Sequence, residues 1–393
     1  MYNRDLSTHI QQLSKDYPVV TVTGPRQSGK TTIVKSLFSE KPYISLENID
    51  EREFAKQDPK GFLNQFKSGA ILDEAQYAPD LFSYIQTRVD NNQKPGEFIL
   101  TGSQNFLLLE KISQSLAGRT AILHLLPLSY AELKPYKQLS LDEFICSGGY
   151  PRIHANNLNP NIWIKNYINT YIERDVRQIK NITDLSKFQL FIRLCAGRIG
   201  QLVNYSSLGN ETGIDTATVK AWLSILQTSF IIFLLQPHHN NFNKRLVKQP
   251  KLYFYDTGIA SYFLGIKRPE DLLIHYMRGN LFENFVINEL IKFQYSQGNE
   301  HNLFFWRNNH GNEVDIIIDQ GTELIPIEIK SSQTINHSFY TGIKYWQSLS
   351  KTNTSYIIYG GDTNRIHSDG ITLLGWKDIN KIPFLKYDTN PHL

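Results

Sequence analysis

The sequence of 393 residues contains only two cysteines, two methionines and no long apolar run. The cysteines, Cys146 and Cys195, lie in no CxxC or Cys/His pattern, so we expect buried free thiols and neither a disulfide framework nor a zinc site. The longest apolar run, residues 230–235, is far shorter than the ~20 residues that span a bilayer. Residues 1–10 lack the basic start and apolar core of a signal peptide. We therefore expect a cytoplasmic protein with no membrane partner.

Neither sign of charge is in large excess over the whole chain, but the charge is unevenly distributed. The sequence has 41 Lys and Arg against 37 Asp and Glu, a formal net charge of +4. Residues 161–255 hold twelve basic and five acidic residues, so the remainder of the chain is slightly acidic. A basic block of this kind can face nucleic acid, although a solvated basic surface is the more common reason for one.

Residues 19–32 carry the most specific pattern in the chain. A β-branched run, residues 19–23, ends in a glycine, and Gly-Lys-Thr follows after four further residues. This matches the P-loop pattern GxxxxGK[ST] in its strand-to-helix setting. By chance, about one chain in a hundred of this length would show the pattern. We interpret the segment as a cradle for the phosphates of a nucleotide, formed by Gly24, Pro25, Arg26, Gln27, Ser28, Gly29, Lys30, Thr31 and Thr32.

The residue types in this segment suit phosphate binding. Gly24 and Gly29 allow backbone conformations that turn successive N–H groups toward a phosphate. Lys30 brings a positive charge to the β- and γ-phosphates, and the Thr31 hydroxyl is a ligand for Mg²⁺. The helix expected from residue 30 onward adds the positive end of its dipole. These residues therefore predict a nucleotide phosphate and Mg²⁺ as ligands.

Residues 1–135 alternate between strand and helix patterns. We expect strands at residues 19–23, 43–46, 70–72, 98–100 and 121–125, in a mainly parallel sheet. The third strand leads into Asp73 and Glu74, the form of a Walker B segment, in which Asp73 holds Mg²⁺ and Glu74 orients the attacking water. A strand that simply ends in solvated acids looks the same in isolation, but the P-loop upstream favours the functional interpretation.

Residues that follow the fourth strand and precede the fifth complete the candidate catalytic set. The fourth strand is expected beside the Walker B strand, so Thr101, Ser103 or Gln104 is placed to touch the γ-phosphate or the attacking water. Arg119 is a candidate to supply positive charge to its own or a neighbouring subunit's site. The alternatives are a turn that caps a helix and an ordinary surface arginine.

Further motifs accompany these segments: Leu-Thr-Gly-Ser at 100–103, Leu-Ala-Gly-Arg at 116–119, Leu-Pro-Leu-Ser at 126–129, Gly-Gly-Tyr-Pro at 148–151 and Tyr-Asp-Thr-Gly at 255–258. Together with the P-loop, the Walker B segment and the additional strand between them, they resemble prokaryotic ATPases of the AAA superfamily whose N-terminal module is fused to a C-terminal region. The resemblance covers nearly the whole chain and implies binding and hydrolysis of ATP. Many relatives of the module work as rings, which leaves a homo-oligomer open.

Residues 202–226 predict a short helix, a turn at Gly213 and a second helix capped by Asp215 or Thr216. Strands are expected at 230–235 and 252–255, and the loop between them holds Lys244, Arg245 and Lys248. This order resembles a winged helix, whose second helix enters a DNA major groove and whose wing touches phosphates. Many winged helices instead pack against protein, and the second helix here contains no arginine.

A third set of charged residues lies near the C-terminus. Glu283 stands on a predicted helix, Asp315 on a predicted strand at 313–319, and Glu328 and Lys330 on the next strand, where their spacing of two puts them on one face. The order Glu, Asp, Glu-x-Lys is similar to restriction-endonuclease-like (PD-(D/E)xK-like) folds, although no proline precedes Asp315. That resemblance implies carboxylates that hold Mg²⁺ and a lysine that positions water. A domain can keep such acids without the reaction.

The sequence therefore predicts an α/β chain of three domains. An AAA-type P-loop ATPase domain is expected at 1–147, a helical linker with a winged-helix-like domain at 148–265, and a restriction-endonuclease-like α/β domain at 266–393. The expected function is ATP-dependent action on DNA or RNA, by binding or by cleavage. The alternative is a nucleotide-controlled switch whose C-terminal domains bind protein and cleave nothing.

Overall fold

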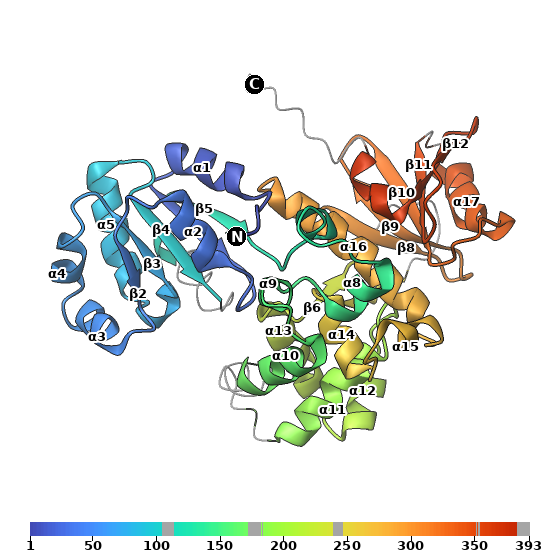
Figure 1. Cartoon of the computed structure of the whole chain (residues 1–393), viewed down its shortest axis with the longest axis horizontal. Helices are drawn as coiled ribbons and strands as arrows, with labels where there is room; N and C mark the ends of the chain where they lie inside the picture. Colours follow the sequence, from blue (N-terminus) through green and yellow to red (C-terminus); the bar gives the residue numbers. More distant parts are fainter. Residues whose placement is uncertain are drawn as a thin grey trace.

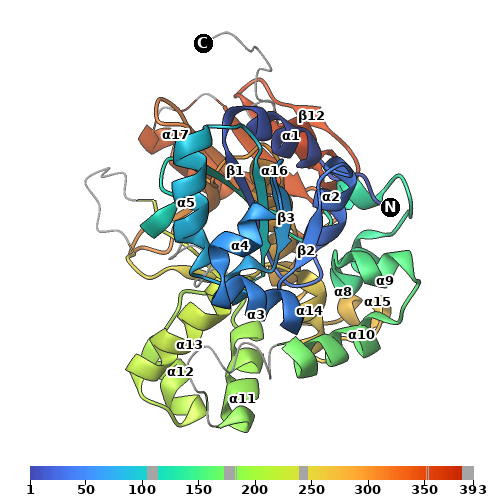
Figure 2. The same ribbon diagram turned by 90° about the vertical axis from the view of Figure 1, so that its left-hand side faces the viewer.

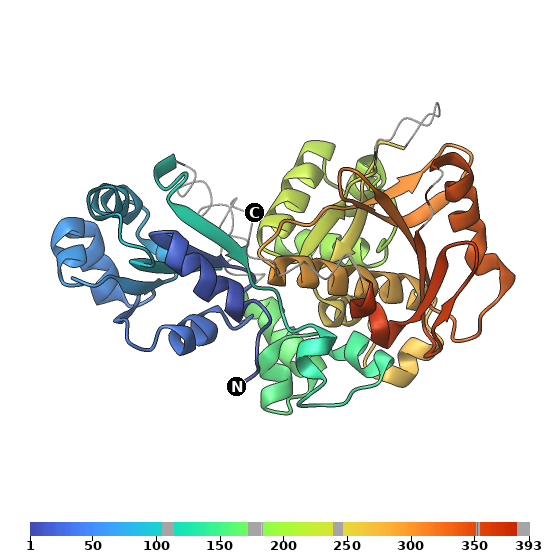
Figure 3. The ribbon, with the colours of Figure 1, turned by 90° about the horizontal axis from the view of Figure 1, so that it is seen from above.

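The computed structural model describes residues 1–103, 114–171, 182, 184–238, 247–350, 352 and 354–382. An N-terminal α/β unit and a C-terminal mixed sheet lie at opposite ends of the molecule, and a helical middle region lies beside both (Figure 1). Seen from above, the long helix α16 (Arg278–Ser296) lies between the two sheets (Figure 3). Within the described residues, no helix has the length and apolar character needed to cross a membrane.

The N-terminal sheet has five parallel strands, β1 (Val19–Thr23), β2 (Tyr43–Ser45), β3 (Ala70–Asp73), β4 (Phe98–Gly102) and β5 (Thr120–His124). The five predicted strands are confirmed, each to within two residues. Short runs of β-branched and apolar residues form such strands because the parallel sheet is buried on both faces. In the order β2-β3-β4-β1-β5, β4 separates the P-loop strand from the Walker B strand. The prediction that the fourth strand adjoins the Walker B strand is therefore confirmed.

Helices cover both faces of this sheet (Figure 2). On one face α1 (Ser7–Asp16) and α2 (Lys30–Leu37) bury an apolar cluster against β1, β4 and β5. On the other face lie α3 (Ile49–Gln57), α4 (Pro59–Asn64) and α5 (Leu81–Asn92). A 3₁₀ turn, η1 (Ala75–Tyr77), follows the Walker B strand. The two faces are thus closed, which leaves the carboxyl edge of the sheet as the place for a ligand.

The middle region is mostly helical. Its helices are α7 (Tyr130–Leu133), α8 (Leu141–Ser147), α9 (Pro151–Ala155), α10 (Pro160–Tyr167), α11 (Leu185–Ala196), α12 (Tyr205–Thr212), α13 (Thr216–Thr228), α14 (Thr257–Phe263) and α15 (Pro269–Leu273). The predicted helix-turn-helix is confirmed as α12 and α13, with Gly213 left-handed at the end of α12. Asp215 is the cap, because its side chain accepts from Thr218 N at 2.8 Å.

The predicted strand pair after α13 is also confirmed. The strands β6 (Ile232–Leu235) and β7 (Lys251–Phe254) pair in antiparallel fashion. Of the basic residues expected in the loop between them, Lys248 is exposed, whereas Lys244 and Arg245 lie outside the described residues. The helices and the strand pair occur in the order of a winged helix, and that assignment stays a prediction.

The C-terminal region is a mixed six-stranded sheet in the order β12-β13-β11-β10-β9-β8. Its elements are α16, β8 (Leu303–Arg307), β9 (Glu313–Asp319), β10 (Leu324–Lys330), η3 (His337–Tyr340), α17 (Thr341–Ser350), β11 (Ser355–Tyr359), β12 (Arg365–Ile366), β13 (Ile371–Gly375) and η4 (Trp376–Lys381). The two strands predicted to carry the acids, β9 and β10, form the expected hairpin, with Ile316 opposite Ile327.

The hydrophobic cores do not follow the predicted domain boundaries. Two clusters flank the N-terminal sheet, whereas a single cluster runs through α7 and α8, the middle region, α16 and one face of the C-terminal sheet. The boundaries expected at 147/148 and 265/266 therefore fall inside one continuous core. Cys195 is buried in this core and Cys146 packs against it, and both are free thiols, as expected. Burial raises the pKa of Cys146 to about 12.

Candidate functional site

The P-loop lies at the carboxyl edge of the N-terminal sheet, between β1 and α2. Gly24 has a φ of 149° and Gly29 a φ of 101°, in the range that side chains disfavour. A Cβ on Gly24 would lie 2.2 Å from the carbonyl oxygen of Leu125, so no larger residue fits there. Gly29 directly precedes α2, whose first N–H groups have no partners within the helix. Both glycines meet the backbone requirement of a phosphate cradle.

Lys30 is buried beneath this loop. Its amine donates to the carbonyl oxygens of Gly24 at 3.0 Å and Pro25 at 2.9 Å. Burial lowers the pKa of Lys30, and the charges of Glu74 and Asp73 oppose that shift. A phosphate would therefore compete with two backbone acceptors for a cation that is already oriented toward the loop.

Asp73 collects three hydroxyl groups at the end of β3. Thr31 Oγ1 donates to Asp73 Oδ1 at 2.9 Å, the Tyr43 hydroxyl donates to Oδ2 at 2.8 Å, and the Thr101 hydroxyl also donates to Oδ1. Burial, together with the hydrogen bond to Asp73, raises the pKa of Tyr43 to about 12. The predicted metal residues Thr31 and Asp73 thus touch each other. A hydroxyl and a carboxylate are the oxygen ligands that Mg²⁺ prefers, so the pair fits the ion.

Glu74 has a strained backbone and a crowded carboxylate. Its φ of 54° and ψ of 48° are left-handed, which is uncommon for a residue with a side chain and is found more often at functional sites. Oε2 accepts from the Gln76 amide at 2.5 Å, from the Ser103 hydroxyl at 2.8 Å and from Ser103 N at 3.3 Å. The carboxylate is therefore held in a fixed position beside Asp73.

Thr101 near the end of β4 and Ser103 directly after the strand contact the two acids, and neither lines the cavity described below. Thr101 donates to Asp73 and accepts from Glu74 N at 3.2 Å, and Ser103 holds Glu74. We expected one of these side chains to touch the phosphate or the water directly, and the structure places Thr101 and Ser103 behind the two carboxylates instead. Gln104, the third candidate, lies outside the described residues.

A cavity of about 680 Å³ opens beside the P-loop, within the size range of small-molecule sites. Six of the predicted binding residues line it, together with the two Walker B acids: Arg26, Gln27, Gly29, Lys30, Thr31, Thr32, Asp73 and Glu74. Other lining residues were not among the predicted site residues: Met1, Tyr2, Arg4, Ile33, Glu47, Leu128, Tyr136, Pro151, Arg152 and Ala155. Of these, Ile33 directly follows the P-loop, Leu128 belongs to Leu-Pro-Leu-Ser at 126–129, and Pro151 and Arg152 lie in or next to Gly-Gly-Tyr-Pro at 148–151.

Arg119 lies at the opposite end of the strands from the P-loop. It directly precedes β5, whose first residue pairs with Val19 at the start of β1, whereas the P-loop follows the end of that strand. The five residues of β1 separate the two edges by roughly 16 Å. The Arg119 guanidinium instead pairs with Asp90 on α5. The expectation that Arg119 serves its own nucleotide site is therefore wrong, and service to a neighbouring subunit stays a prediction.

Residues 16–134 match the family described as AAA domain. The N-terminal part of the chain is an AAA-type Walker ATPase domain. Such domains bind ATP with Mg²⁺, and hydrolysis is the activity they imply. Residues 138–270 match DUF8612 and residues 278–379 match DUF4143, and both are described as domains of unknown function.

Curated relatives extend over most of this chain. An uncharacterized protein of Mycobacterium tuberculosis is 29% identical over 336 residues, covering 84% of this chain and 74% of its own. One from Methanocaldococcus jannaschii is 25% identical over 291 residues, covering 67% and 62%. Among solved structures, the Walker-type ATPase of Pyrococcus abyssi has 16% identity and a TM-score of 0.45, covering 67% of this chain and 96% of its own. A superposition this loose supports no statement on function.

The structure also brings together the four residues of the predicted nuclease site. Glu283 on α16, Asp315 on β9, and Glu328 and Lys330 on β10 lie close enough for their charges to interact. Burial, with the charges of Glu328 and Glu283, raises the pKa of Asp315 well above its usual range. Burial also raises the pKa of Glu328. The order of residues in the sequence was thus sufficient to find this cluster.

A fifth residue, Lys251 on β7 of the middle region, was not predicted. Its buried amine contacts Glu283 at 3.2 Å and also pairs with Glu313. Burial favours the neutral amine, but the charges of Glu283 and its other neighbours outweigh it and hold the pKa of Lys251 well above the usual value. The Tyr253 hydroxyl donates to the same oxygen of Glu283.

The carboxylates of this cluster already have partners. Asp315 Oδ2 accepts from Ile329 N at 2.7 Å, Glu328 pairs with Lys330, and Glu283 pairs with Lys251. Among the described residues, no group of three or more acids, histidines or cysteines is arranged to hold a metal ion. One oxygen of the cluster, Glu328 Oε2, is buried without a hydrogen-bond partner, and the Mg²⁺ site that the nuclease hypothesis requires stays a prediction.

Proposed function

We propose that this chain is a Mg²⁺-dependent ATPase that uses its C-terminal half to bind nucleic acid. The observation that carries the ATPase proposal is the convergence of Lys30, Thr31, Asp73 and Glu74 on one cavity. A lysine, a metal-binding pair and an acid beside it are the parts that phosphoryl transfer to water requires.

Each residue has a distinct role in the proposed reaction. Lys30 exchanges its two carbonyl acceptors for phosphate oxygens, and Thr31 and Asp73 hold Mg²⁺. The ion, when bound, neutralises charge on the β- and γ-phosphates. Glu74, fixed by Ser103 and Gln76, orients the attacking water. Arg152, which enters the cavity from α9, supplies a further positive charge near the phosphates.

The nucleic-acid proposal is supported by charge and by the order of elements in the middle region. Residues 161–255 carry the basic excess of the chain, and α12, α13 and the β6–β7 pair occur in the order of a winged helix. Exposed basic side chains on this region include Arg193 and Lys220. Because two of the C-terminal acids, Glu283 and Glu328, are paired with Lys251 and Lys330, we propose binding without metal-dependent cleavage.

One observation favours the alternative, a nucleotide-controlled switch that binds protein. Polar residues on α13 have internal partners: Thr218 Oγ1 donates to Asp215 at 2.9 Å, and the Lys220 amine lies 5.4 Å from the Tyr205 ring centroid. Val219 and Leu223 of the same helix are buried. Few side chains therefore remain for reading bases, as expected of a helix that packs against protein.

The test is the rate of ATP hydrolysis by the full chain, with and without single-stranded and double-stranded DNA or RNA. Stimulation by one nucleic acid supports the first proposal. Hydrolysis that no nucleic acid changes, combined with no binding in a gel-shift assay, supports the switch. No hydrolysis and no calorimetric heat with Mg²⁺ and ATP would refute the ATPase assignment itself.

A further inference from the structure

Arg4 precedes α1, yet its guanidinium contacts three separate parts of the molecule. It donates to Ser28 O in the P-loop at 2.8 Å and to Leu126 O at 2.6 Å, and its Nε pairs with Glu132 at 3.0 Å. Only 8% of the Arg4 side chain and 7% of the Glu132 side chain are exposed. A Cβ on Gly29 would lie 3.6 Å from Arg4 Nη1. A buried arginine thus fixes the backbone beside the glycine that faces the phosphates.

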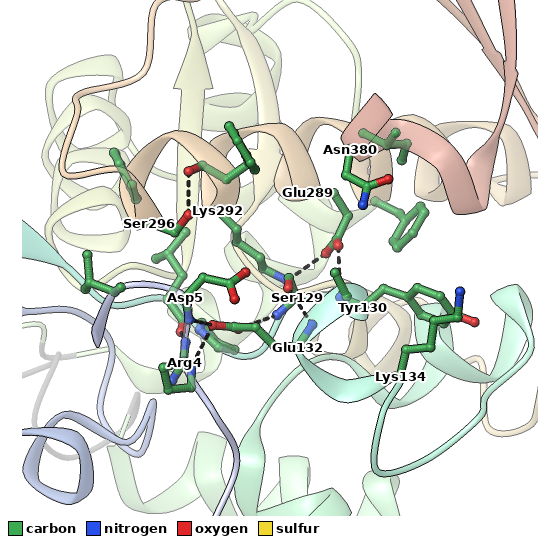
Figure 4. A pocket seen from close by; sticks show the side chains of 18 of the residues that line it. Arg4, Asp5, Ser129, Tyr130, Glu132, Lys134, Glu289, Lys292, Ser296 and Asn380 are labelled. Atoms are coloured by element: carbon green, nitrogen blue, oxygen red, sulfur yellow. Dashed lines mark hydrogen bonds and ion pairs between the residues drawn. The ribbon is translucent and has the colours of Figure 1, made fainter. Parts of the chain in front are cut away.

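Glu132 connects this arginine to α16 through the first turn of α7 (Figure 4). Its Oε2 accepts from Ser129 N at 3.0 Å. The next backbone N–H, that of Tyr130, donates to Glu289 on α16 at 2.8 Å. Glu289 is paired with Lys292 at 3.3 Å, and 10% and 7% of these two side chains are exposed. A chain of buried polar contacts therefore runs from the P-loop to α16.

The other half of α16 belongs to the C-terminal cluster. Glu283, six residues before Glu289, contacts Lys251 and Tyr253 on β7. The helix has 19 residues and is roughly 28 Å long. One rigid element thus touches the nucleotide-binding unit near one end and the junction of the middle and C-terminal regions near the other.

We propose that Arg4 is a positioning residue of the nucleotide site. We further propose that the contacts from Arg4 through Glu132 and the adjoining backbone of α7 to Glu289 link nucleotide binding to the position of α16. The proposal rests on the ATP binding proposed above. Phosphates that engage the N–H groups around Gly29 displace Ser28 O, the acceptor of Arg4. Because Arg4 and Glu132 are buried and paired, they move together rather than separate. Linkage requires the reverse effect as well: a change at Glu289 alters nucleotide affinity.

The experiment measures binding of Mg²⁺ and a non-hydrolysable ATP analogue to the full chain by calorimetry. Arg4→Lys keeps the charge, but the compact lysine ammonium cannot reach all three acceptors that the planar guanidinium spans, so affinity should fall at least fivefold. Glu289→Gln, which lies outside the cavity beside the P-loop, should lower affinity by a similar factor. The double variant should be no weaker than the weaker single variant, because both break one chain of contacts. If Glu289→Gln does not fold, Glu132→Gln interrupts the same series of contacts and replaces it in the experiment.

The matched control is Glu300→Gln. Glu300 also joins the C-terminal region to the N-terminal sheet, through His124 at 3.0 Å, but belongs to no part of this chain of contacts. Its affinity should stay within twofold of wild type. Hydrogen exchange separates the proposed link from a general loss of stability. The analogue should change amide protection on α16 in the wild-type chain and should not change it in Arg4→Lys.

The possible outcomes separate the two proposals. If wild type binds no analogue, the proposed ATP binding fails. If wild type binds and Glu289→Gln binds equally well, or the two single effects multiply in the double variant, the link is refuted and ATP binding stands. An equal loss in Glu300→Gln would show general loosening of the interface and would also refute the link.

Discussion

Lys30 has two neutral acceptors in this structure and is predicted to exchange them for phosphate oxygens. Lys30→Ala removes the positive charge that lies buried beneath the loop at the start of α2. Two charge-assisted hydrogen bonds contribute about 3 kcal/mol, so nucleotide affinity should fall at least ~100-fold. Calorimetry and phosphate release measure this. Lys60→Ala, an exposed lysine on α4, is the control, and wild-type turnover in Lys30→Ala would contradict the phosphate role.

Glu74 is predicted to act on water and not on binding. Glu74→Gln keeps an oxygen for the Ser103 and Gln76 donors but removes the charge that orients water. Hydrolysis should fall by roughly 10²- to 10⁴-fold, while affinity for ATP changes little. Isolation of the chain with intact ATP bound, followed over time, is the measurement. An unchanged hydrolysis rate would show that another group activates the water.

At this scale the sequence predicted residues that stand in local patterns. The P-loop residues and Asp73 were found because their spacing along the chain is fixed by one turn and one strand end. Arg4, Arg152 and Lys251 were missed because each reaches its site from a distant segment, and no pattern in the chain marks a residue that a fold brings in from far away. The left-handed conformation of Glu74 was equally invisible, since nothing in its neighbours requires it.

At the scale of elements, the Gly-Gly-Tyr-Pro and Tyr-Asp-Thr-Gly motifs pack against each other beside α9. Asp256, from the Tyr-Asp-Thr-Gly motif, accepts from Gly149 N at 2.8 Å. A Cβ on Gly148 would lie 2.1 Å from the Asp256 carboxylate. His154 on α9 lies 2.8 Å from Gly148 O through Nε2, which must carry the proton because a carbonyl only accepts. Asp256 and His154 thus both hold the turn before α9, and α9 carries Arg152 toward the cavity.

This contact predicts a pH dependence of stability. Burial lowers the pKa of His154 below its usual value of 6.5, so the unfolded chain takes up a proton more readily than the folded chain. The stability that the neutral histidine contributes is present above pH 6.5 and is lost as the pH falls through the lower folded pKa. The free energy of unfolding should therefore fall more between pH 7 and pH 5 in wild type than in His154→Gln. Equal losses in the two proteins would contradict the assignment.

Elements were predictable where composition and periodicity agree. The strands of the N-terminal sheet and the pair α12 and α13 have apolar spacing, caps and glycines that all indicate the same structure. The environment of the charged residues on β10 could not be predicted, because alternating polar residues there are compatible with a solvent-exposed face. Only the fold shows that Glu328 is buried. The neutralisation of that cluster by Lys251 depends on contact between regions that the sequence analysis treated as separate domains.

For the whole molecule, the nucleic-acid proposal predicts a strong dependence of binding on salt. Affinity for DNA should fall at least tenfold between about 50 and 200 mM salt, because contacts with phosphates release counterions. Arg193→Glu and Lys220→Glu, both exposed in the middle region, should weaken binding and reduce the salt slope by about one each. Lys56→Glu on α3 is the charge-matched control. Binding that is insensitive to salt and to these changes would favour the protein-binding switch.

The continuous core from Leu126 to Ile382 has a consequence for how the molecule melts. The regions at residues 138–270 and 278–379 share this core, so neither can unfold while the other keeps its packing. Calorimetry should therefore record the two regions as a single cooperative transition, separate from that of the N-terminal sheet. Saturating Mg²⁺ and nucleotide should raise the N-terminal transition by mass action. Three resolved transitions would contradict a shared interior.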